Sequence, residues 1–195
     1  GETFRLLSDI ETNRSIITVT GFADSPSFGI AIPWVKNGLL EPYWTHDEEM
    51  VLFKMVRKIL LHRNILIEGQ NYSYDVQYFR RYFAAIPNLA FDSMLAHHLL
   101  FPGTPKDLGY LSSLYCQHHW YWKDDGKEWN SKGTVADLCL YNAWDCVRNF
   151  EINTVLRGLI KSMKMEEQWE EVIATAHLLQ KMMFQIVGSR RQMQM

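Results

Sequence analysis

The feature of the sequence that most constrains the fold is a change of pattern near residue 45. Before it lie three short segments that we interpret as strands, Thr3–Ile10, Ser15–Phe22 and Ser27–Ile32. Polar turns are expected at Glu11–Arg14 and Ala23–Pro26, so these strands would form an antiparallel meander. After residue 45, helical patterns alternate with short apolar strands. This order predicts an α/β domain of three layers, in which helices flank a mixed β-sheet.

The later part of the chain supplies the helices. Thr45 to Glu48 has the pattern of a capping box, and apolar residues at helical spacing follow it. Asp92 has the pattern of a helix N-cap, and we do not expect it to bind metal. The other expected elements are strands at Ile65–Ile67 and Leu89–Phe91 and helices at Tyr72–Ala84, Asp107–Tyr115, Thr134–Met163 and Glu166–Val187, the last ending near Gly188.

The composition is that of a packed globular protein, with 47% apolar residues in a chain of 195. A net charge of −2 argues against binding long duplex nucleic acid by charge alone. A nucleic-acid substrate would therefore have to be bound by contacts at one local site. No apolar run reaches the roughly 18 residues that a membrane span needs. Three cysteines cannot all pair in disulfides, which favours a reducing compartment. We therefore expect a cytoplasmic monomer that does not bind membranes.

Two acids lie two residues apart in the apolar segment Leu6–Thr12. Residues i and i+2 of a strand point to the same face, so Asp9 and Glu11 would stand side by side. Two ionised carboxylates that close repel each other unless a cation lies between them. The pair therefore predicts a metal site, although an isolated Asp-x-Glu also fits a solvated strand end.

Two further pairs repeat a spacing of four residues, Asn71 with Asp75 and Tyr141 with Asp145. On a helix this spacing places one side chain above the other. Taken singly, each pair also fits an exposed helix surface with a solvated carboxylate.

Together the pairs read Asp-x-Glu, Asn-x-x-x-Asp and Tyr-x-x-x-Asp in chain order. In this order they resemble the three motifs of the DEDD exonuclease superfamily, tyrosine subclass. The sequence is most similar to the proofreading 3′-5′ exonuclease domain of family A DNA polymerases, of the bacterial polymerase I type. Segments between the pairs share this resemblance, namely Ile67–Asn71, Phe91–Leu95 and Asp107–Leu111. The resemblance covers about residues 4 to 155.

The resemblance implies a ribonuclease H-like fold and the removal of nucleotides from the 3′ end of single-stranded or frayed DNA. It also implies two Mg²⁺ or Mn²⁺ ions bound by four carboxylates, those of Asp9, Glu11, Asp75 and Asp145. Tyr141 would orient the attacking water. By the same resemblance, Thr12 and Asn71 would contact the terminal nucleotide.

The resemblance also implies a division of the chain. Residues 1–160 would form the exonuclease domain, and residues 161–195 a helical extension that connects to a covalently linked polymerase module. We therefore expect a piece of a larger protein from a bacterial or phage-infected cell, with DNA 3′ ends as its partner.

Two other functions remain open. A ribonuclease D-like or repair-type exonuclease would use the same residues on RNA or DNA ends, and an inactive scaffold domain would bind nucleic acid without cutting it. The loop at residues 117–133 leaves a further choice, because its aromatic residues could stack on an unpaired base or pack in the core. These residues are Trp120, Tyr121, Trp122 and Trp129. The loop lysines could meet phosphates or only water; they are Lys123, Lys127 and Lys132.

Overall fold

The computed structural model describes residues 1–36, 41–117 and 133–193, with side chains as far as residue 184. Its strands form one sheet in the order β3-β2-β1-β4-β5. The strands are β1 (Phe4–Asn13), β2 (Ile16–Ser25), β3 (Phe28–Pro33), β4 (Ile65–Gly69) and β5 (Leu89–Asp92). The first three pair antiparallel, and β4 lies parallel to both β1 and β5. The predicted mixed sheet is confirmed.

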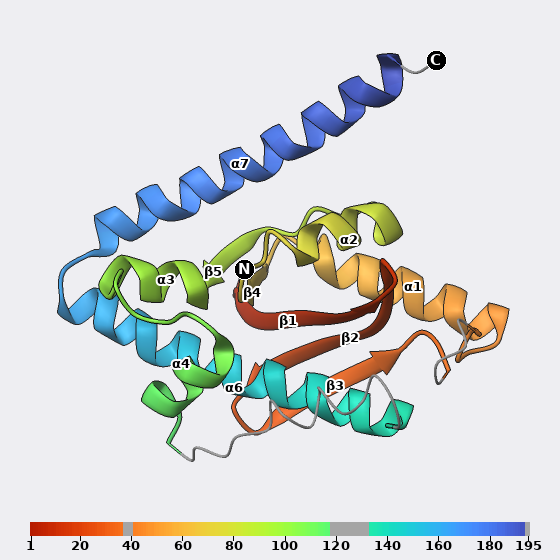
Figure 1. Ribbon diagram of the computed structural model, residues 1–195, viewed down its shortest axis with the longest axis horizontal. Coiled ribbons are helices and arrows are strands. Elements are labelled where there is room, and N and C mark those ends of the chain that lie inside the picture. Colours follow the sequence, from red (N-terminus) through yellow and green to blue (C-terminus); the bar gives the residue numbers. More distant parts are fainter. Residues whose placement is uncertain (37–40, 118–132, 194–195) are drawn as a thin grey trace.

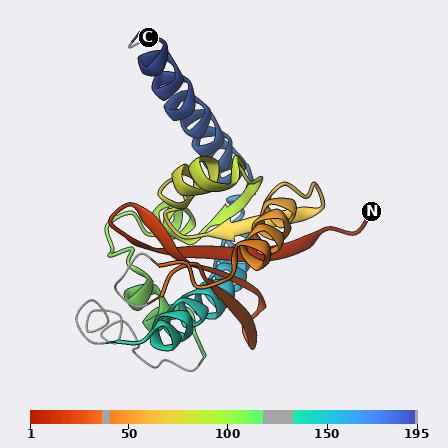
Figure 2. The same ribbon diagram turned by 90° about the vertical axis from the view of Figure 1, so that its right-hand side faces the viewer.

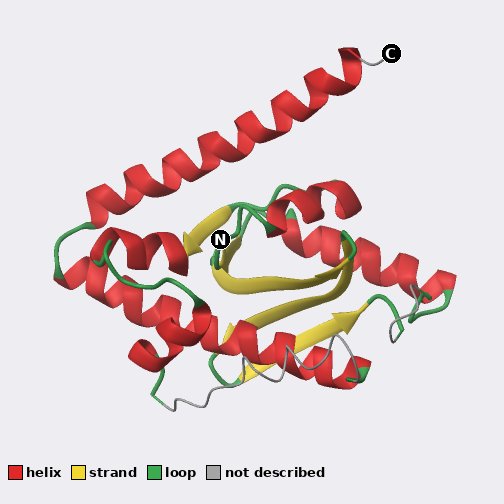
Figure 3. Ribbon diagram, viewed as in Figure 1, coloured by secondary structure: helices red, strands yellow, loops and turns green. Residues whose placement is uncertain are grey.

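Helices cover both faces of this sheet (Figure 1 and, coloured by secondary structure, Figure 3). They are α1 (His46–Leu60), α2 (Asp75–Phe83), α3 (Ser93–Leu100), α4 (Leu108–Tyr115), α6 (Val135–Ser162) and α7 (Glu166–Met193). On one face, α1 and α2 share a core with Ile10 and Ile67. On the other face, Val147 and Phe150 of α6 pack on Leu7 of β1. The three layers expected from the sequence are therefore present.

The alternation of β1 decides which of its residues reach α6. Leu7 packs against α6, whereas Ile10 belongs to the core under α1 and α2. Successive side chains of a strand point to opposite faces, so Asp9 and Glu11 lie on the same face as Leu7. Both acids therefore face the helix that carries Asp145.

The first hairpin differs from the prediction. Strand β1 continues to Asn13, and only Arg14 and Ser15 form the turn. Their φ angles are 48° and 65°, and a two-residue type I′ hairpin turn requires positive φ at both positions. The turn expected from Glu11 onward is wrong, because Glu11 still pairs with Val19 of β2. Glu11 is thus held by strand backbone and not by a loop.

The last helix also differs, because α7 runs to Met193 and passes Gly188, where the sequence predicts its end. Phe184 joins the core under α1 and α2, and His177 donates from Nε2 to the carbonyl of Leu89 at 2.7 Å. The C-terminal part of the helix extends away from the sheet (Figure 2). Among the described residues, no helix combines the length and the apolar character that crossing a membrane requires.

Candidate active site

Three carboxylates from two distant parts of the chain meet at the face of β1 that α6 covers. Asp9 and Glu11 of β1 and Asp145 of α6 each offer a ligand atom, and these atoms lie within 4.8 Å of one another. We call these three residues the acid cluster. Asp145 is buried, and the other two are half-buried. Carboxylate oxygens are hard ligands of the kind that Mg²⁺ and Mn²⁺ prefer, and a cation would relieve the repulsion among three negative groups.

Asp75 lies beside the acid cluster but is not part of it. It begins α2, is buried, and accepts a hydrogen bond at Oδ1 from the backbone N–H of Ile10 at 3.1 Å. Burial, followed by the negative charge of Asp9, raises the pKa of the Asp75 carboxyl well above its usual range. The structure therefore brings Asp75 to β1 next to Asp9, as a buried acid held by the strand backbone.

The segment before Asp75 differs from the prediction. Helix α2 begins at Asp75, so Asn71 lies in a turn and the expected stacking of the two on one helix face is wrong. Asn71 has a φ of 49°, a left-handed conformation that asparagine tolerates better than most residues. Its carbonyl accepts from the N–H of Tyr74 at 2.9 Å. The tight turn before α2, and not helical spacing from Asn71, therefore positions Asp75 beside β1.

Asp92 holds this turn and also starts the next helix. Its carboxylate accepts from the N–H groups of Met94 at 2.9 Å and Leu95 at 3.2 Å, which confirms the predicted N-cap of α3. It also accepts from the N–H groups of Asn71 at 3.2 Å and Tyr72 at 2.9 Å. Burial raises the pKa of Asp92 although all four hydrogen bonds favour its ionised form. The second pair of contacts carries no sequence signal, because its partners lie about twenty residues upstream.

A buried tyrosine adds a second attachment between this turn and β1. The hydroxyl of Tyr72 lies 3.0 Å from Oγ of Ser8, the residue before Asp9. Its ring covers Gly69, where an added Cβ would lie only 2.4 Å from Cδ2 of Tyr72. Glycine at that position is therefore required for the close approach.

Helix α6 supplies the third motif. It begins with a capping box of Thr134 and Asp137. Tyr141 lies one turn before Asp145 and packs its half-buried ring against the apolar cluster shared by α3, α4 and α6. The next residue, Asn142, donates from Nδ2 to Oδ2 of Asp9 at 2.7 Å. Asn142 is not a residue of the three motifs, so they do not predict this contact.

The two residues expected to contact a terminal nucleotide lie in different settings. Thr12 follows Glu11 on β1, and its Oγ1 lies 2.6 Å from the hydroxyl of Tyr74, which is itself 3.2 Å from that of Tyr78. Asn71 is exposed in its turn. Their contact with substrate stays a prediction, and Tyr74 is an exposed neighbour that the sequence did not single out.

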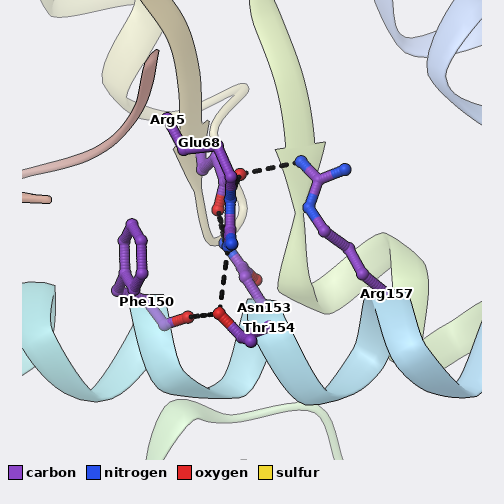
Figure 4. A network of polar contacts seen from close by, with 6 residues as sticks. All are labelled: Arg5, Glu68, Phe150, Asn153, Thr154 and Arg157. Atoms are coloured by element: carbon purple, nitrogen blue, oxygen red, sulfur yellow. Dashed lines mark hydrogen bonds and ion pairs between the residues drawn. The ribbon is translucent and has the colours of Figure 1, made fainter. Parts of the chain in front are cut away.

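A buried carboxylate, Glu68 of β4, fastens α6 to the sheet (Figure 4). Each of its oxygens accepts two hydrogen bonds. Arg5 of β1 donates from Nε at 2.6 Å and from Nη2 at 3.0 Å. Asn153 and Arg157 of α6 donate at 3.1 Å and 2.7 Å. The contact joins β1 and α6, the two elements that carry the acid cluster.

The aromatic residues proposed for stacking, Trp120, Tyr121, Trp122 and Trp129, lie outside the described residues. The same is true of Lys123, Lys127 and Lys132. Both interpretations of that loop therefore stay predictions.

Comparisons with known proteins place this geometry in a family. A family model described as 3′-5′ exonuclease matches residues 12–161, which is more than half of the chain. The match includes Asp75, Tyr141 and Asp145 and begins immediately after Glu11. A comparison with curated protein sequences gave no match.

Solved structures share the fold at low sequence identity. Brucella melitensis NrnC with bound Mg²⁺ has a TM-score of 0.68 at 15% identity, over 92% of this chain and 83% of that one. Escherichia coli RNase D has a TM-score of 0.64 at 15% identity, over 92% and 44%. The POL domain of Pol1 from M. smegmatis has a TM-score of 0.56 at 12% identity, over 84% and 25%. The shared fold is ribonuclease H-like, as expected.

The family match and the acid cluster indicate the same chemistry. A nuclease that cuts with divalent cations needs convergent oxygen ligands, and the acid cluster is a convergent set of such oxygens. The chain therefore belongs to the 3′-5′ exonuclease family and is a metal-dependent phosphodiester hydrolase.

Proposed function

We propose that this chain removes nucleotides one at a time from the 3′ end of a single-stranded nucleic acid, using two Mg²⁺ or Mn²⁺ ions. The observation that carries the proposal is the acid cluster, in which residues from the two ends of the domain converge within 4.8 Å. This arrangement supports the proposal, because cleavage with two metal ions requires convergent oxygen ligands.

Each residue of the motifs has a role in this proposal. Asp9, Glu11 and Asp145 bind the cations, and Asp75 acts from the outer side of the site, where the Ile10 N–H fixes one of its oxygens. When bound, two divalent ions generate the nucleophile from water and neutralise the leaving 3′ oxygen. Tyr141 orients the attacking water through its hydroxyl, because a phenol is a weak base at neutral pH.

The substrate that we place first is the 3′ end of RNA. The solved structure of RNase D is described as an exoribonuclease involved in structured RNA processing, and its fold covers nearly the whole of this chain. The hydroxyl groups of Thr12 and Tyr74, beside Glu11, offer hydrogen bonds to a sugar. In this proposal Thr12 and Asn71 contact the last nucleotide.

A second candidate is proofreading of DNA within a family A polymerase. The fold shared with the POL domain of Pol1 supports this candidate. The shared region is 25% of that chain, so there the fold is one part of a longer chain. Helix α7 presents several exposed apolar side chains on which a polymerase module could pack. They are Leu178, Leu179, Met182 and Met183. Residues 1–160 would then be the exonuclease domain and residues 161–195 its connection.

Matched oligonucleotides separate these candidates. A 5′-labelled single strand of RNA and one of DNA with the same sequence are incubated with the chain and Mg²⁺, and the shortened products are resolved by length. We expect a ladder that starts at the 3′ end and disappears in EDTA. Faster shortening of RNA supports the first candidate, and faster shortening of DNA supports the second.

The control variants test the assignment of the site. Asp9→Ala or Asp145→Ala should abolish shortening while the fold is kept, because loss of one acid also relieves repulsion in the metal-free chain. Glu170→Gln, an exposed position on α7, loses a carboxylate charge away from the acid cluster and should leave the rate unchanged. Normal turnover by Asp9→Ala would overturn the proposal.

A further inference from the structure

One hydrogen bond at the acid cluster involves a residue outside the three motifs. Asn142 is fully buried on the sheet-facing side of α6. It follows Tyr141 in the sequence and precedes Asp145 by three residues. Its Nδ2 donates to Oδ2 of Asp9 at 2.7 Å. The hydrogen bond joins residues 133 positions apart and connects the first motif directly to the third.

The neighbouring strand is shaped to admit this amide. Gly21 of β2 pairs with Asp9 across the sheet. A Cβ added at Gly21 would lie 2.1 Å from Oδ1 and 2.9 Å from Cγ of Asn142, and 2.7 Å from Sγ of Cys146. Only a residue without a side chain leaves room there. The amide therefore lies in a close-fitting space beside the first acid, where it has little freedom to rotate.

The contact also carries a cost. Among the described residues, Oδ1 of Asn142 has no hydrogen-bond partner, although it is buried. A buried carbonyl oxygen without a partner destabilises the folded state, and an apolar residue of similar size would avoid that cost.

An amide has the right chemistry for holding a metal-binding acid. Groups that hydrogen-bond to a metal ligand fix its orientation and tune its affinity for the ion. Lysine or arginine at this position would bring a positive charge that competes with the cation for Asp9. The neutral N–H of Asn142 holds one carboxylate oxygen without adding charge to the acid cluster.

We propose that Asn142 is a positioning residue that holds the Asp9 carboxylate in the orientation needed to bind the catalytic cation. The inference rests on the proposed function, because it assigns Asp9 as a metal ligand. The expected consequence is tighter metal binding, since the acid is oriented before the ion arrives.

Direct binding of Mn²⁺, measured by isothermal titration calorimetry on the full chain, tests this role without relying on activity. We expect Asn142→Ala to weaken Mn²⁺ binding by about ten-fold or more, as is typical when a group that supports a metal ligand is lost. The Mg²⁺ concentration for half-maximal cleavage should rise by a similar factor, and much of the rate should return at high Mg²⁺.

Asn149 provides a matched control on the same helix. It is buried, its Oδ1 also has no partner among the described residues, and it lies seven residues, about 10 Å, farther along α6. Asn149→Ala should therefore alter thermal stability but leave Mn²⁺ binding as in the unmodified chain. If Asn142→Ala fails to fold, Asn142→Ser is the second variant. It also removes the Nδ2 donor, but it keeps a polar group whose hydroxyl can bond to the backbone of its own helix.

The outcomes are distinct. Unchanged Mn²⁺ binding in a folded Asn142 variant, or an equal loss in Asn149→Ala, would overturn the positioning role and leave the metal site intact. Absence of Mn²⁺ binding by the unmodified chain would instead overturn the proposed site, and this inference with it. A selective loss in the Asn142 variants supports both.

Discussion

The hydrogen bonds of Glu68 attach α6 to the sheet, and from them we predict how much stability the Glu68→Gln variant loses. Glu68 is fully buried, and its two oxygens accept four hydrogen bonds from Arg5, Asn153 and Arg157 (Figure 4). Glutamine keeps the shape of the side chain but replaces one oxygen by an NH₂ group. That group cannot accept, and it would point at donors. The substitution therefore removes two hydrogen bonds and leaves two guanidinium groups without a counter-charge.

The magnitude follows from the exposure of the partners. Two hydrogen bonds to a charged group contribute roughly 3 to 6 kcal/mol together. The side chains of Arg5 and Arg157 are 31% and 34% exposed. Water can therefore solvate each guanidinium group in the variant, which offsets a large part of the lost free energy. The net loss is about 2 to 3 kcal/mol of unfolding free energy. For a chain of this size that corresponds to a fall of roughly 4 to 12 °C in Tm.

Urea unfolding followed by tryptophan fluorescence measures this loss. Glu170→Gln on the exposed side of α7 is the control for the change of charge, and it should stay within about 0.5 kcal/mol of the unmodified chain. A Glu68→Gln variant as stable as that control would refute the reasoning, since the buried hydrogen bonds would then contribute nothing to folding.

Other substitutions test the remaining contacts of the site. Because burial and Asp9 raise the pKa of Asp75, the folded metal-free chain holds a proton that the unfolded chain loses above about pH 4, so stability should fall as the pH rises. Asp75→Asn should remove that dependence when unfolding in EDTA is compared between about pH 5 and about pH 8. Asp92→Ala should lose stability before activity, and a stable but inactive protein would contradict its role in holding the turn. Tyr141→Phe should slow cleavage in a single-turnover assay less than Asp9→Ala does, and an equal loss would show that the hydroxyl does more than orient water.

Much of the fold could be predicted from the sequence because its signals are local. The capping box at Thr45 and the N-cap at Asp92 are read from neighbouring residues, and the structure confirms both. Element ends were harder to place. The polar residues after Ile10 look like a turn, but pairing with β2 extends the strand to Asn13.

The candidate site was predictable in part for a similar reason. The spacing of Asp9 and Glu11 on a strand is enough to place both on one face, and the structure brings Asp145 to them. The contacts of Asn142 with Asp9 and of Glu68 with Arg157 join positions 133 and 89 residues apart, and no local pattern encodes such a pair. The motifs do not settle the substrate. The resemblance implies DNA proofreading, whereas the comparisons support a 3′-5′ exonuclease without that narrower role.

The acid cluster as a metal centre is the central claim, and a crystal grown with Mn²⁺ and a nucleoside monophosphate tests it most directly. The anomalous difference map is predicted to show a peak in direct contact with carboxylate oxygens of Asp9, Glu11 and Asp145. A second peak on the side of Asp75 would support the proposed pair of ions. A map in which Mn²⁺ binds elsewhere, with no peak among these three side chains, would contradict the account.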